Sequence, residues 1–567
     1  MIKDDKLLRP NPVFYRAQTE ILDGKWDFFS EQTGSSVINV PFCPQSKLSG
    51  IGYSGIIKTC EYSTTFTAEK VAGERLFLHF GAVDHKAVLF INGKYVGMHI
   101  GGFTPFSFDI TEFLTGQNLL KLCVYDDDED IMFRGKQTKK ETSYGCFYTR
   151  TIGIWQSVWT ERVPDTYIKK VFFTPDIKNQ AVNVKLFTEG KGDYSVHVLF
   201  NGKDVGERSG FAAYSTEFTI PLSESRLWDI DKGDLYDVVI RFNGDEVFSY
   251  FGLREAGYSG YDFLVNGRKV FQKLVLDQGF YKDGLYTAPD VFAMENDILI
   301  AKRLGFNGAR LHQKIFDPKF LYLCDKAGYM VWGEFPSWGG DCTSLKYLGQ
   351  FISEWTETLE RDYNHPSIIT WCPFNEEWAG QDGSGKKLDY RFIETVFYFT
   401  KRFDTTRPVV DVSGGYHTAK TDLFDFHCYA EPAELKKYID DFSKNGKLYV
   451  PLLYPDFENG YDFTSYSAGL PVNLSEFGGK TLGTGFSSAS ADGDGEVKNL
   501  SEWGYGQGAS NADEFINYYE ELVKTVFAEP KISGFCYTQL YDIEQEQNGF
   551  YRYDRSDKLT DEQKDRK

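Results

Sequence analysis

Two glutamates stand directly after short apolar runs, where they could act together on one substrate. Glu376 lies in WCPFNEEW (residues 371–378), and Glu476 lies in LSEFGG (residues 474–479). In a parallel barrel the C-terminal ends of the strands converge on one opening, so positions far apart in the chain can face each other across a pocket. Hydrolysis of a glycosidic bond requires one carboxyl group that holds a proton and a second that stays ionised. The sequence therefore predicts that Glu376 and Glu476 are a catalytic pair.

The elements that would position this pair are helices alternating with short apolar strands. ENDILIAKRLGFNGARLHQ and FLYLCDKAGYMVWGEFP each contain an amphipathic helix, a glycine turn and a buried strand, and SEWTETLERDYNHPSIITWCPFNE repeats the order. This alternation predicts a (β/α)8 TIM barrel over residues 258–567. A doubly wound open sheet is the alternative, but the glycine-rich phosphate turn usual in that fold is missing.

Two β-sandwiches are predicted to precede the barrel. In residues 1–165, LFLHF and AVLFI flank polar turns, and NGK at 92–94 predicts a tight reversal, so a jelly-roll-like sandwich is expected. In residues 166–257, VNVKLF, YSVHVLF, TEFTIPL and LYDVVIRF are spaced like the strands of an immunoglobulin-like sandwich. The predicted fold class is thus multidomain, β followed by α/β.

The composition excludes several classes of partner. A formal net charge of −20 argues against nucleic acid and against an anionic membrane, because both need a basic face. The run DDDED at 126–130 is interpreted as an exposed acidic loop rather than a metal site. No metal and no organic cofactor are predicted.

The location is predicted from cysteine usage and from the lack of long apolar runs. Nine cysteines are scattered singly, which favours reduced thiols. No run approaches the roughly 20 apolar residues of a membrane helix. A cytoplasmic enzyme is therefore expected. Residues 483–512, rich in Gly, Ser and Asp, are predicted to be a long loop that covers the barrel mouth as a lid.

Several ordered motifs resemble glycoside hydrolase family 2, which includes β-galactosidases, β-glucuronidases and β-mannosidases. LDGKWDF (22–28), VPFCPQSKLSGIG (40–52) and TIGIWQSVWTE (151–161) resemble its sugar-binding-like sandwich. GFNGARLHQ, LCDKAGYMVWGE, NHPSIITWCPFNEEW and LSEFGG follow in the order found in its barrel. The resemblance covers nearly the whole chain. It implies a retaining, exo-acting β-glycosidase whose partner is a glycoside or oligosaccharide, with a homo-oligomer as one possible assembly.

The resemblance also implies roles for individual residues. Glu376 matches the acid/base, Glu476 the nucleophile, and Asn375 the residue that holds the sugar 2-hydroxyl. Tyr429 resembles the tyrosine that hydrogen-bonds the nucleophile. Glu334 matches a barrel carboxylate near the sugar subsite, with a paired structural acid as the alternative.

Other residues at predicted strand ends are assigned from their chemistry. Arg310 could orient Glu476 and hold its pKa down. Many relatives have Arg, two residues, then His, whereas here His312 is displaced by one position. His427 either lines the sugar pocket or is a satisfied interior histidine. Stacking on sugar faces is the hypothesis for several aromatic residues, with core packing as the alternative for each: Trp338, Trp378, Trp503, Tyr537 and Tyr541.

The identity of the sugar stays open at this level. The lysine of the Asn, one residue, Lys motif of β-glucuronidases is missing from EQEQNGFYRYDR (544–555), although Arg552 or Arg555 could bind a carboxylate instead. A neutral β-galactoside or related pentoside is favoured, with a β-glucuronidase, β-galacturonidase or arabinosidase as the alternative. A hypothesis of another class is a non-catalytic carbohydrate-binding protein.

Overall fold

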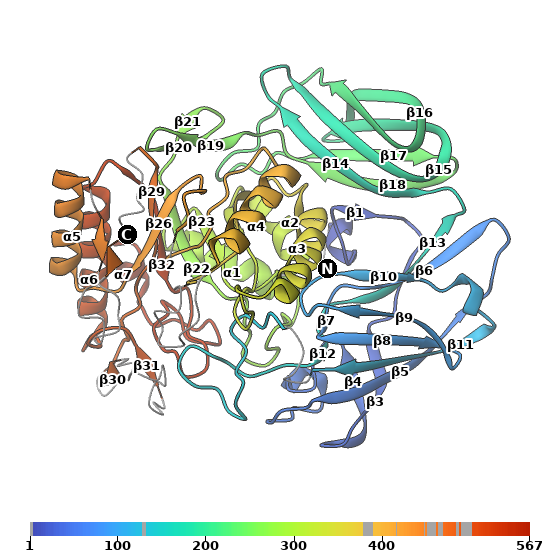
Figure 1. Ribbon diagram of the computed structural model, residues 1–567, viewed down its shortest axis with the longest axis horizontal. Coiled ribbons are helices and arrows are strands. Elements are labelled where there is room, and N and C mark those ends of the chain that lie inside the picture. The colour runs from blue at the N-terminus through green and yellow to red at the C-terminus, as the bar shows by residue number, and fades with distance from the viewer. Residues whose placement is uncertain are drawn as a thin grey trace.

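The structure is a computed structural model in which two β-sandwiches and a barrel follow one another along the chain (Figure 1). It describes residues 4–126, 132–377, 389–415, 417–446, 448–450, 461–462, 469–483, 487–488 and 502–566. The first sandwich and the second both lie against the barrel (Figure 1). Most of the predicted lid, and Trp378, fall outside the described residues.

The first sandwich pairs a six-stranded antiparallel sheet, β4-β3-β5-β11-β8-β9, with a four-stranded sheet, β10-β6-β13-β2. Alternate residues of β8, Ala87, Leu89 and Ile91, are buried, as a half-exposed strand requires. Asn92 and Gly93 have positive φ, so the reversal predicted at NGK is confirmed. The bounds are β2 Thr19–Ile21, β3 Gly24–Ser30, β4 Gly34–Val40, β5 Thr59–Ala68, β6 Glu74–Phe80, β7 Val83–Asp84, β8 Lys86–Ile91, β9 Lys94–Ile100, β10 Phe106–Asp109, β11 Gly116–Tyr125, β12 Gly153–Ile154 and β13 Val158–Pro164, with short helices at Asp5–Leu8, Lys47–Ser49 and Thr111–Phe113.

The second sandwich is organised by one long bent hairpin. The strands predicted at VNVKLF and YSVHVLF are a single strand, β15, because a register shift between Phe187 and Lys191 bends the chain without ending its pairing. Gly190, at φ 82°, lies inside that shift. The bounds are β1 Phe14–Tyr15, β14 Ile168–Asp176, β15 Ala181–Phe200, β16 Lys203–Pro221, β17 Tyr236–Phe242 and β18 Asp245–Phe251, followed by a small sheet of β19 Ala256–Ser259, β20 Asp262–Val265 and β21 Arg268–Lys269.

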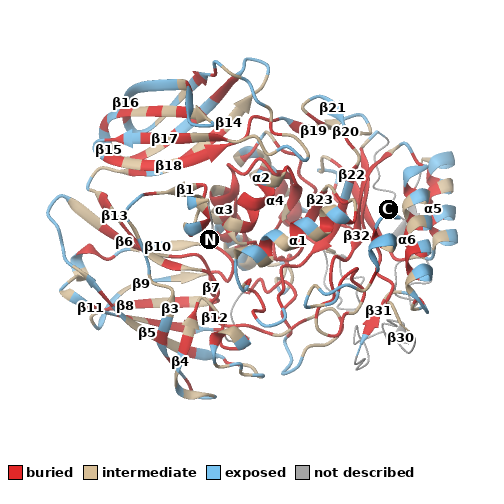
Figure 2. Ribbon diagram, turned by 180° about the vertical axis from the view of Figure 1, so that it is seen from behind, coloured by how far each residue is buried: buried red, intermediate tan, exposed pale blue. Residues whose placement is uncertain are grey.

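Among the described residues of the barrel, seven parallel strands pair in the order β25-β24-β23-β22-β32-β29-β26. Residues 408–414 take the place of a strand between β25 and β26. Val410 N donates a hydrogen bond to Trp371 O at 3.1 Å, and Glu376 N donates one to Ser413 O at 2.9 Å. The strands are buried on both faces (Figure 2), as expected where helices cover a parallel sheet. The bounds are β22 Gln272–Asp277, β23 Gly308–Leu311, β24 Met330–Glu334, β25 Ile368–Cys372, β26 Phe424–Cys428, β29 Val472–Gly478 and β32 Ile532–Thr538, with short pairs β27 Tyr449–Val450 and β28 Tyr461–Asp462, and β30 Ser487–Ser488 and β31 Trp503–Gly504.

The barrel helices begin and end at the residues that the sequence pattern favours. Asp290 and Asp317 cap α1 and α2 by accepting from backbone N–H groups, and Gly328 ends α2 in the left-handed conformation. The bounds are α1 Val291–Arg303, α2 Pro318–Ala327, α3 Leu345–Asp362, α4 Tyr390–Phe403, α5 Pro432–Asn445, α6 Ala512–Phe527 and α7 Asp561–Lys564. Within the described ranges, no helix is long and apolar enough to cross a membrane. All nine cysteines are free thiols.

Candidate active site

Glu476 lies near the C-terminal end of β29, held by donors from two other strands. Arg310 Nη1, at the end of β23, donates to its Oε1 at 2.8 Å, and Tyr429 Oη, just after β26, donates to its Oε2 at 2.5 Å. The Glu476 side chain is 6% exposed. A carboxylate that is buried and held by a cation and a hydroxyl in this way is fixed in one orientation, with its charge compensated.

Glu376 follows β25 and faces Glu476 across the same opening. Oxygen atoms of the two carboxylates and a nitrogen of His427 all lie within 4.8 Å of one another. His427 Nδ1 is 2.7 Å from Glu376 Oε1 and 3.5 Å from Glu476 Oε2, so the imidazole lies beside both. The Glu376 side chain is 20% exposed, more than that of Glu476. The more accessible carboxyl is the one better placed to exchange protons with a leaving group or water.

The electrostatics of the site favour ionised Glu476. Burial acts to raise the pKa of the Glu476 carboxyl, but the electrostatic influence of His427 and of the Arg310 guanidinium outweighs it and holds that pKa at about 2. The carboxylate is therefore negatively charged throughout the neutral range, as a nucleophile must be.

Asn375 is buried next to Glu376, and no described residue accepts from its side-chain donor. Its Oδ1 accepts from Arg310 Nη2, and its backbone carbonyl accepts from Trp338 Nε1 at 3.0 Å. Its Nδ2 has no hydrogen-bond partner in the part of the chain that the structure describes. An unpaired buried amide donor beside two carboxylates is chemically suited to a ligand hydroxyl.

Glu334 lies behind Arg310, with both oxygens already engaged by the protein. Arg310 Nε donates to its Oε2 at 2.5 Å, and Gln313 N donates to its Oε1 at 2.9 Å. This environment matches the paired structural acid rather than a sugar ligand. His312 Nδ1 is 2.9 Å from the same Oε1 without hydrogen-bond geometry. Burial, with the nearby cations Lys136 and Arg310, lowers the pKa of His312 well below its usual value, so the ring is neutral and forms no ion pair.

A chain of polar contacts supports His427 from behind. Its Nε2 is 3.3 Å from Ser413 Oγ, which in turn donates to Asp425 Oδ2 at 2.8 Å. His417 lies beyond, with Nδ1 2.6 Å from Asp411 Oδ1 and Nε2 3.4 Å from Asp425 Oδ1. The orientation of His427 thus depends on a fully buried network.

The His417 network predicts a loss of stability at alkaline pH. Burial acts to lower the pKa of His417, but the carboxylates of Asp411 and Asp425 outweigh it and raise that pKa from 6.5 to about 10. A raised pKa stabilises the fold fully below the unfolded value, and this stability is lost as pH rises through the folded value. In calorimetry, we expect wild type to unfold at least about 2 °C above His417→Gln at pH 6, and the difference to close toward pH 10. A constant difference across this range would contradict the charged histidine.

Among the aromatic residues singled out in the sequence, Trp338 lies at the barrel opening, whereas Trp503, Tyr537 and Tyr541 are buried. Trp338 lines the opening next to Asn375 and carries the ammonium of Lys136 over its ring at 4.1 Å. Trp503 is buried, and its Nε1 donates to Gly145 O at 2.7 Å. Tyr537 points away from the barrel interior and packs against Phe477, Tyr519 and Phe550, which corrects its assignment as a sugar platform. Tyr541 Oη donates a hydrogen bond to Asp277 Oδ1 at 2.6 Å, and Tyr541 is likewise a packing residue.

Tyr505 and Lys136 are among the residues of this site that had not been predicted. Tyr505 stacks on Tyr429 with ring centroids 3.5 Å apart and an interplanar angle of 9°. Lys136 comes from the first sandwich, and the charges of Glu476 and Glu376 both act to raise the pKa of its ammonium. The signal for Tyr505 was its place in an aromatic and glycine-rich stretch, whereas Lys136 gave no signal, because nothing local shows that a loop of another domain reaches the barrel.

The described residues offer one group of possible metal ligands in the site, Glu376, His427 and Glu476. A cation bound there would displace the contact between His427 and Glu376. We therefore interpret the three as a hydrogen-bonded cluster. The absence of a cofactor stays a prediction.

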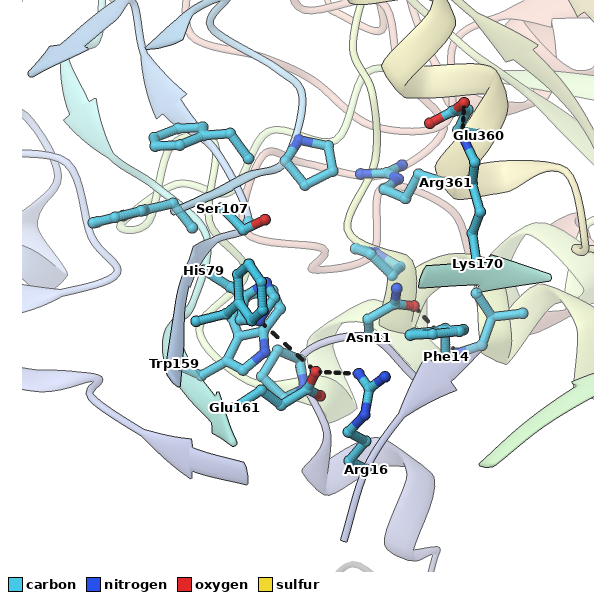
Figure 3. A pocket seen from close by; sticks show the side chains of 18 of the residues that line it. Asn11, Phe14, Arg16, His79, Ser107, Trp159, Glu161, Lys170, Glu360 and Arg361 are labelled. Atoms are coloured by element: carbon cyan, nitrogen blue, oxygen red, sulfur yellow. Dashed lines mark hydrogen bonds and ion pairs between the residues drawn. The ribbon is translucent and has the colours of Figure 1, made fainter. Parts of the chain in front are cut away.

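A separate cavity of about 390 Å³ lies where the two sandwiches meet α3 (Figure 3). Its acidic groups are already engaged: Glu161 pairs with Arg16 at 2.8 Å and Glu360 with Lys170, Glu357 accepts from Thr104 Oγ1 at 2.5 Å, and Asp317 caps α2. Neither Glu376 nor Glu476 lines it. The paired carboxylates give this cavity no acid and nucleophile for the chemistry of the barrel opening.

Three family models match the chain in succession. They are "Glycosyl hydrolases family 2, sugar binding domain" at residues 54–164, "Glycosyl hydrolases family 2" at 166–254 and "Glycosyl hydrolases family 2, TIM barrel domain" at 261–459. Among curated proteins, a β-galactosidase of Thermoanaerobacterium thermosulfurigenes is 28% identical over 59% of this chain. The chain spans 49% of the length of that relative.

Solved structures share the whole architecture. A β-galacturonidase of Eisenbergiella tayi bound to galacturonate has a TM-score of 0.75 at 21% identity, covering 98% of this chain and 97% of that one. A β-D-glucuronidase of Dictyoglomus thermophilum has a TM-score of 0.76 at 19% identity, covering 98% and 97%. At these identities the likeness concerns the fold.

Proposed function

The chain belongs to glycosyl hydrolase family 2, and we propose that it is a retaining, exo-acting β-glycosidase that removes terminal sugars from glycosides or oligosaccharides. The observation that carries the proposal is the placement of Glu376 and Glu476, with oxygens within 4.8 Å of each other at the mouth of the barrel. Retaining glycosidases have carboxyl groups about 5–5.5 Å apart, whereas inverting ones need about 6.5–9.5 Å to admit a water molecule.

The geometry supports a double displacement. Glu476 attacks the anomeric carbon, and the bond from that carbon to the leaving oxygen breaks as Glu376 gives its proton to that oxygen. Water then attacks the same carbon while Glu376 takes up a proton, and the bond to Glu476 breaks. Arg310 and Tyr429 hold Glu476 in line, and the free Nδ2 of Asn375 suits the 2-hydroxyl, whose hydrogen bond strengthens as positive charge develops.

The test is the stereochemistry of the first product. A panel of p-nitrophenyl β-glycosides (galactoside, glucoside, galacturonide, glucuronide, mannoside, fucoside and arabinosides) identifies the substrate by release of nitrophenol. Proton NMR of the hydrolysed substrate should then show the β-anomer first, with the α-anomer appearing only by mutarotation. Early appearance of the α-anomer would overturn the retaining mechanism. Sugar binding without release from any glycoside would favour the non-catalytic alternative.

Two candidate sugars are supported by different observations. The curated β-galactosidase relative favours a neutral β-galactoside, as the sequence analysis also does. The charge of the site, through Lys136, favours a β-hexuronide. The panel contains both.

We propose that the enzyme is located in the cytoplasm. A cytoplasmic location is supported by nine free thiols, eight of them buried. Homo-oligomerisation and the domain boundaries 165/166 and 257/258 stay predictions.

A further inference from the structure

A loop of the first sandwich is docked firmly onto the barrel mouth. Backbone N–H groups of Arg134 and Gly135 donate to Trp338 O at 2.7 and 3.3 Å. Gly135 has φ 56°, and a Cβ there would lie 2.3 Å from Gln313 O, so the backbone approaches the barrel as closely as only glycine permits. Figure 1 shows the chain that precedes β12, residues 132–152, extending from the first sandwich toward the barrel. The next residue, Lys136, is therefore delivered to the site by a fixed backbone.

Among the residues that the structure describes, none accepts a hydrogen bond from the ammonium of Lys136. The residue is 7% exposed, and its Nζ lies 4.1 Å from the centre of the Trp338 ring. Across the described ranges, this Nζ makes no hydrogen bond and no ion pair, whereas the backbone carbonyl of Lys136 accepts from Tyr148 N at 2.8 Å. A buried cation without an acceptor is costly, so such a group beside the candidate active site marks the place of a ligand acceptor.

Other cations that could have bound a ligand carboxylate are already engaged. Arg310 is shared among Glu334, Glu476 and Asn375. Arg555 forms a bidentate ion pair with Asp297 at 2.9 Å, which removes it from the role that the sequence left open. The guanidinium of Arg552 donates to the backbone carbonyl of Asp557.

Lys136 keeps its positive charge although it is buried. Burial acts to lower the pKa of its ammonium, but the acidic groups of Cys146, Glu546 and Glu476 outweigh it, and the pKa is raised. The charge of Glu376 acts in the same direction. Glu546 is itself occupied, since Tyr148 Oη donates to it at 2.5 Å and Asn548 Nδ2 at 2.9 Å.

We propose that Lys136 determines specificity by binding the carboxylate of the sugar, and that the substrates are β-D-hexuronides. This inference rests on the proposed glycosidase function and names its substrate class. A sugar carboxylate would both accept from the ammonium and neutralise it, whereas a hydroxyl would only accept. It would also enter a site that already holds two glutamates, which requires a cation of this kind.

The experiment compares matched substrates that differ only at C6. kcat/KM is measured for p-nitrophenyl β-D-galacturonide against the galactoside, and for the glucuronide against the glucoside, with wild type, Lys136→Met and Lys136→Arg. We expect wild type to prefer a uronide, and Lys136→Met to lower the uronide-to-neutral ratio about 10- to 100-fold, the effect of losing a charged hydrogen bond. Lys136→Arg should recover part of the ratio.

A binding measurement separates recognition from chemistry. Calorimetric titration of Glu476→Gln with free D-galacturonate and D-galactose should show a preference for galacturonate that disappears when Lys136→Met is added. Equal losses on charged and neutral substrates would overturn the proposal and assign Lys136 to the glutamates or to a hydroxyl. Hydrolysis of galactoside but not of any uronide would overturn it while the proposed function stands. Failure of folded wild type on every glycoside would count against the proposed function itself.

Discussion

Glu476→Gln should abolish glycoside release, with kcat reduced about 10⁵-fold or more, because an amide cannot form the glycosyl-enzyme bond. The substitution keeps the size of the side chain, and its oxygen can still accept from Arg310 Nη1. Arg310 retains Glu334, and Tyr429 Oη retains Thr538 Oγ1 at 3.1 Å. The loss should therefore fall on the chemical step. It is measured as steady-state release of nitrophenol from the substrate identified in the panel.

A suitable control is Glu434→Gln. Glu434, on the outer helix α5, also accepts a hydrogen bond from a tyrosine, Tyr438, but lies outside the catalytic constellation. This variant should keep wild-type kcat. If Glu476→Gln kept more than about 1% of wild-type kcat with an unchanged melting temperature, Glu476 would not be the nucleophile.

Side chains that follow strands were accessible to sequence reasoning, because the barrel itself brings strand ends together. Arg310, Glu376, His427 and Glu476 come from different strand ends and meet in one site. Their chemistry could be anticipated from residue type and position. Their hydrogen-bond partners could not, as Glu334 shows: the same strand end placed its carboxyl behind Arg310 rather than toward the opening.

Strand register is a second limit on what the sequence alone can predict. Adjacent residues of a strand point to opposite faces, so an apolar run identifies a strand without saying which residues face the barrel axis. Tyr537 packs outward against α6, while Thr538, one residue later, reaches Tyr429 inside the site. Residues 408–414 were not predicted as a strand. They occupy a strand position beside β25 but make only isolated backbone hydrogen bonds to it.

Contacts between domains are the third limit. Lys136 stands in a polar stretch of the first sandwich, and no local pattern distinguishes a solvent-exposed loop from one that docks on another domain. Gly135, directly before Lys136, was a partial indication of this contact, because a glycine can mark a close backbone approach. The approach to Gln313 O is visible only in three dimensions.

Glu376→Gln should lower activity by an amount that depends on the leaving group. For a phenyl glycoside, whose leaving oxygen needs a proton, kcat/KM should fall about 10²–10⁴-fold, the usual worth of general acid catalysis. For the 2,4-dinitrophenyl glycoside of the same sugar, kcat/KM should fall less than about 10-fold, because that phenolate leaves without a proton. The glutamine oxygen can still accept from His427 Nδ1, so the histidine contact is preserved.

Added azide tests the role of Glu376 as the general base of the second step. The variant should accumulate the glycosyl-enzyme with the activated substrate, since no base deprotonates water, and added azide should raise kcat by attacking the anomeric carbon without needing a base. The product of that reaction is the β-glycosyl azide. Glu377→Gln, which removes the neighbouring carboxylate, should show neither the dependence on leaving group nor the rescue. Equal losses on both substrates, with no effect of azide, would remove Glu376 from acid and base catalysis and leave it a binding residue.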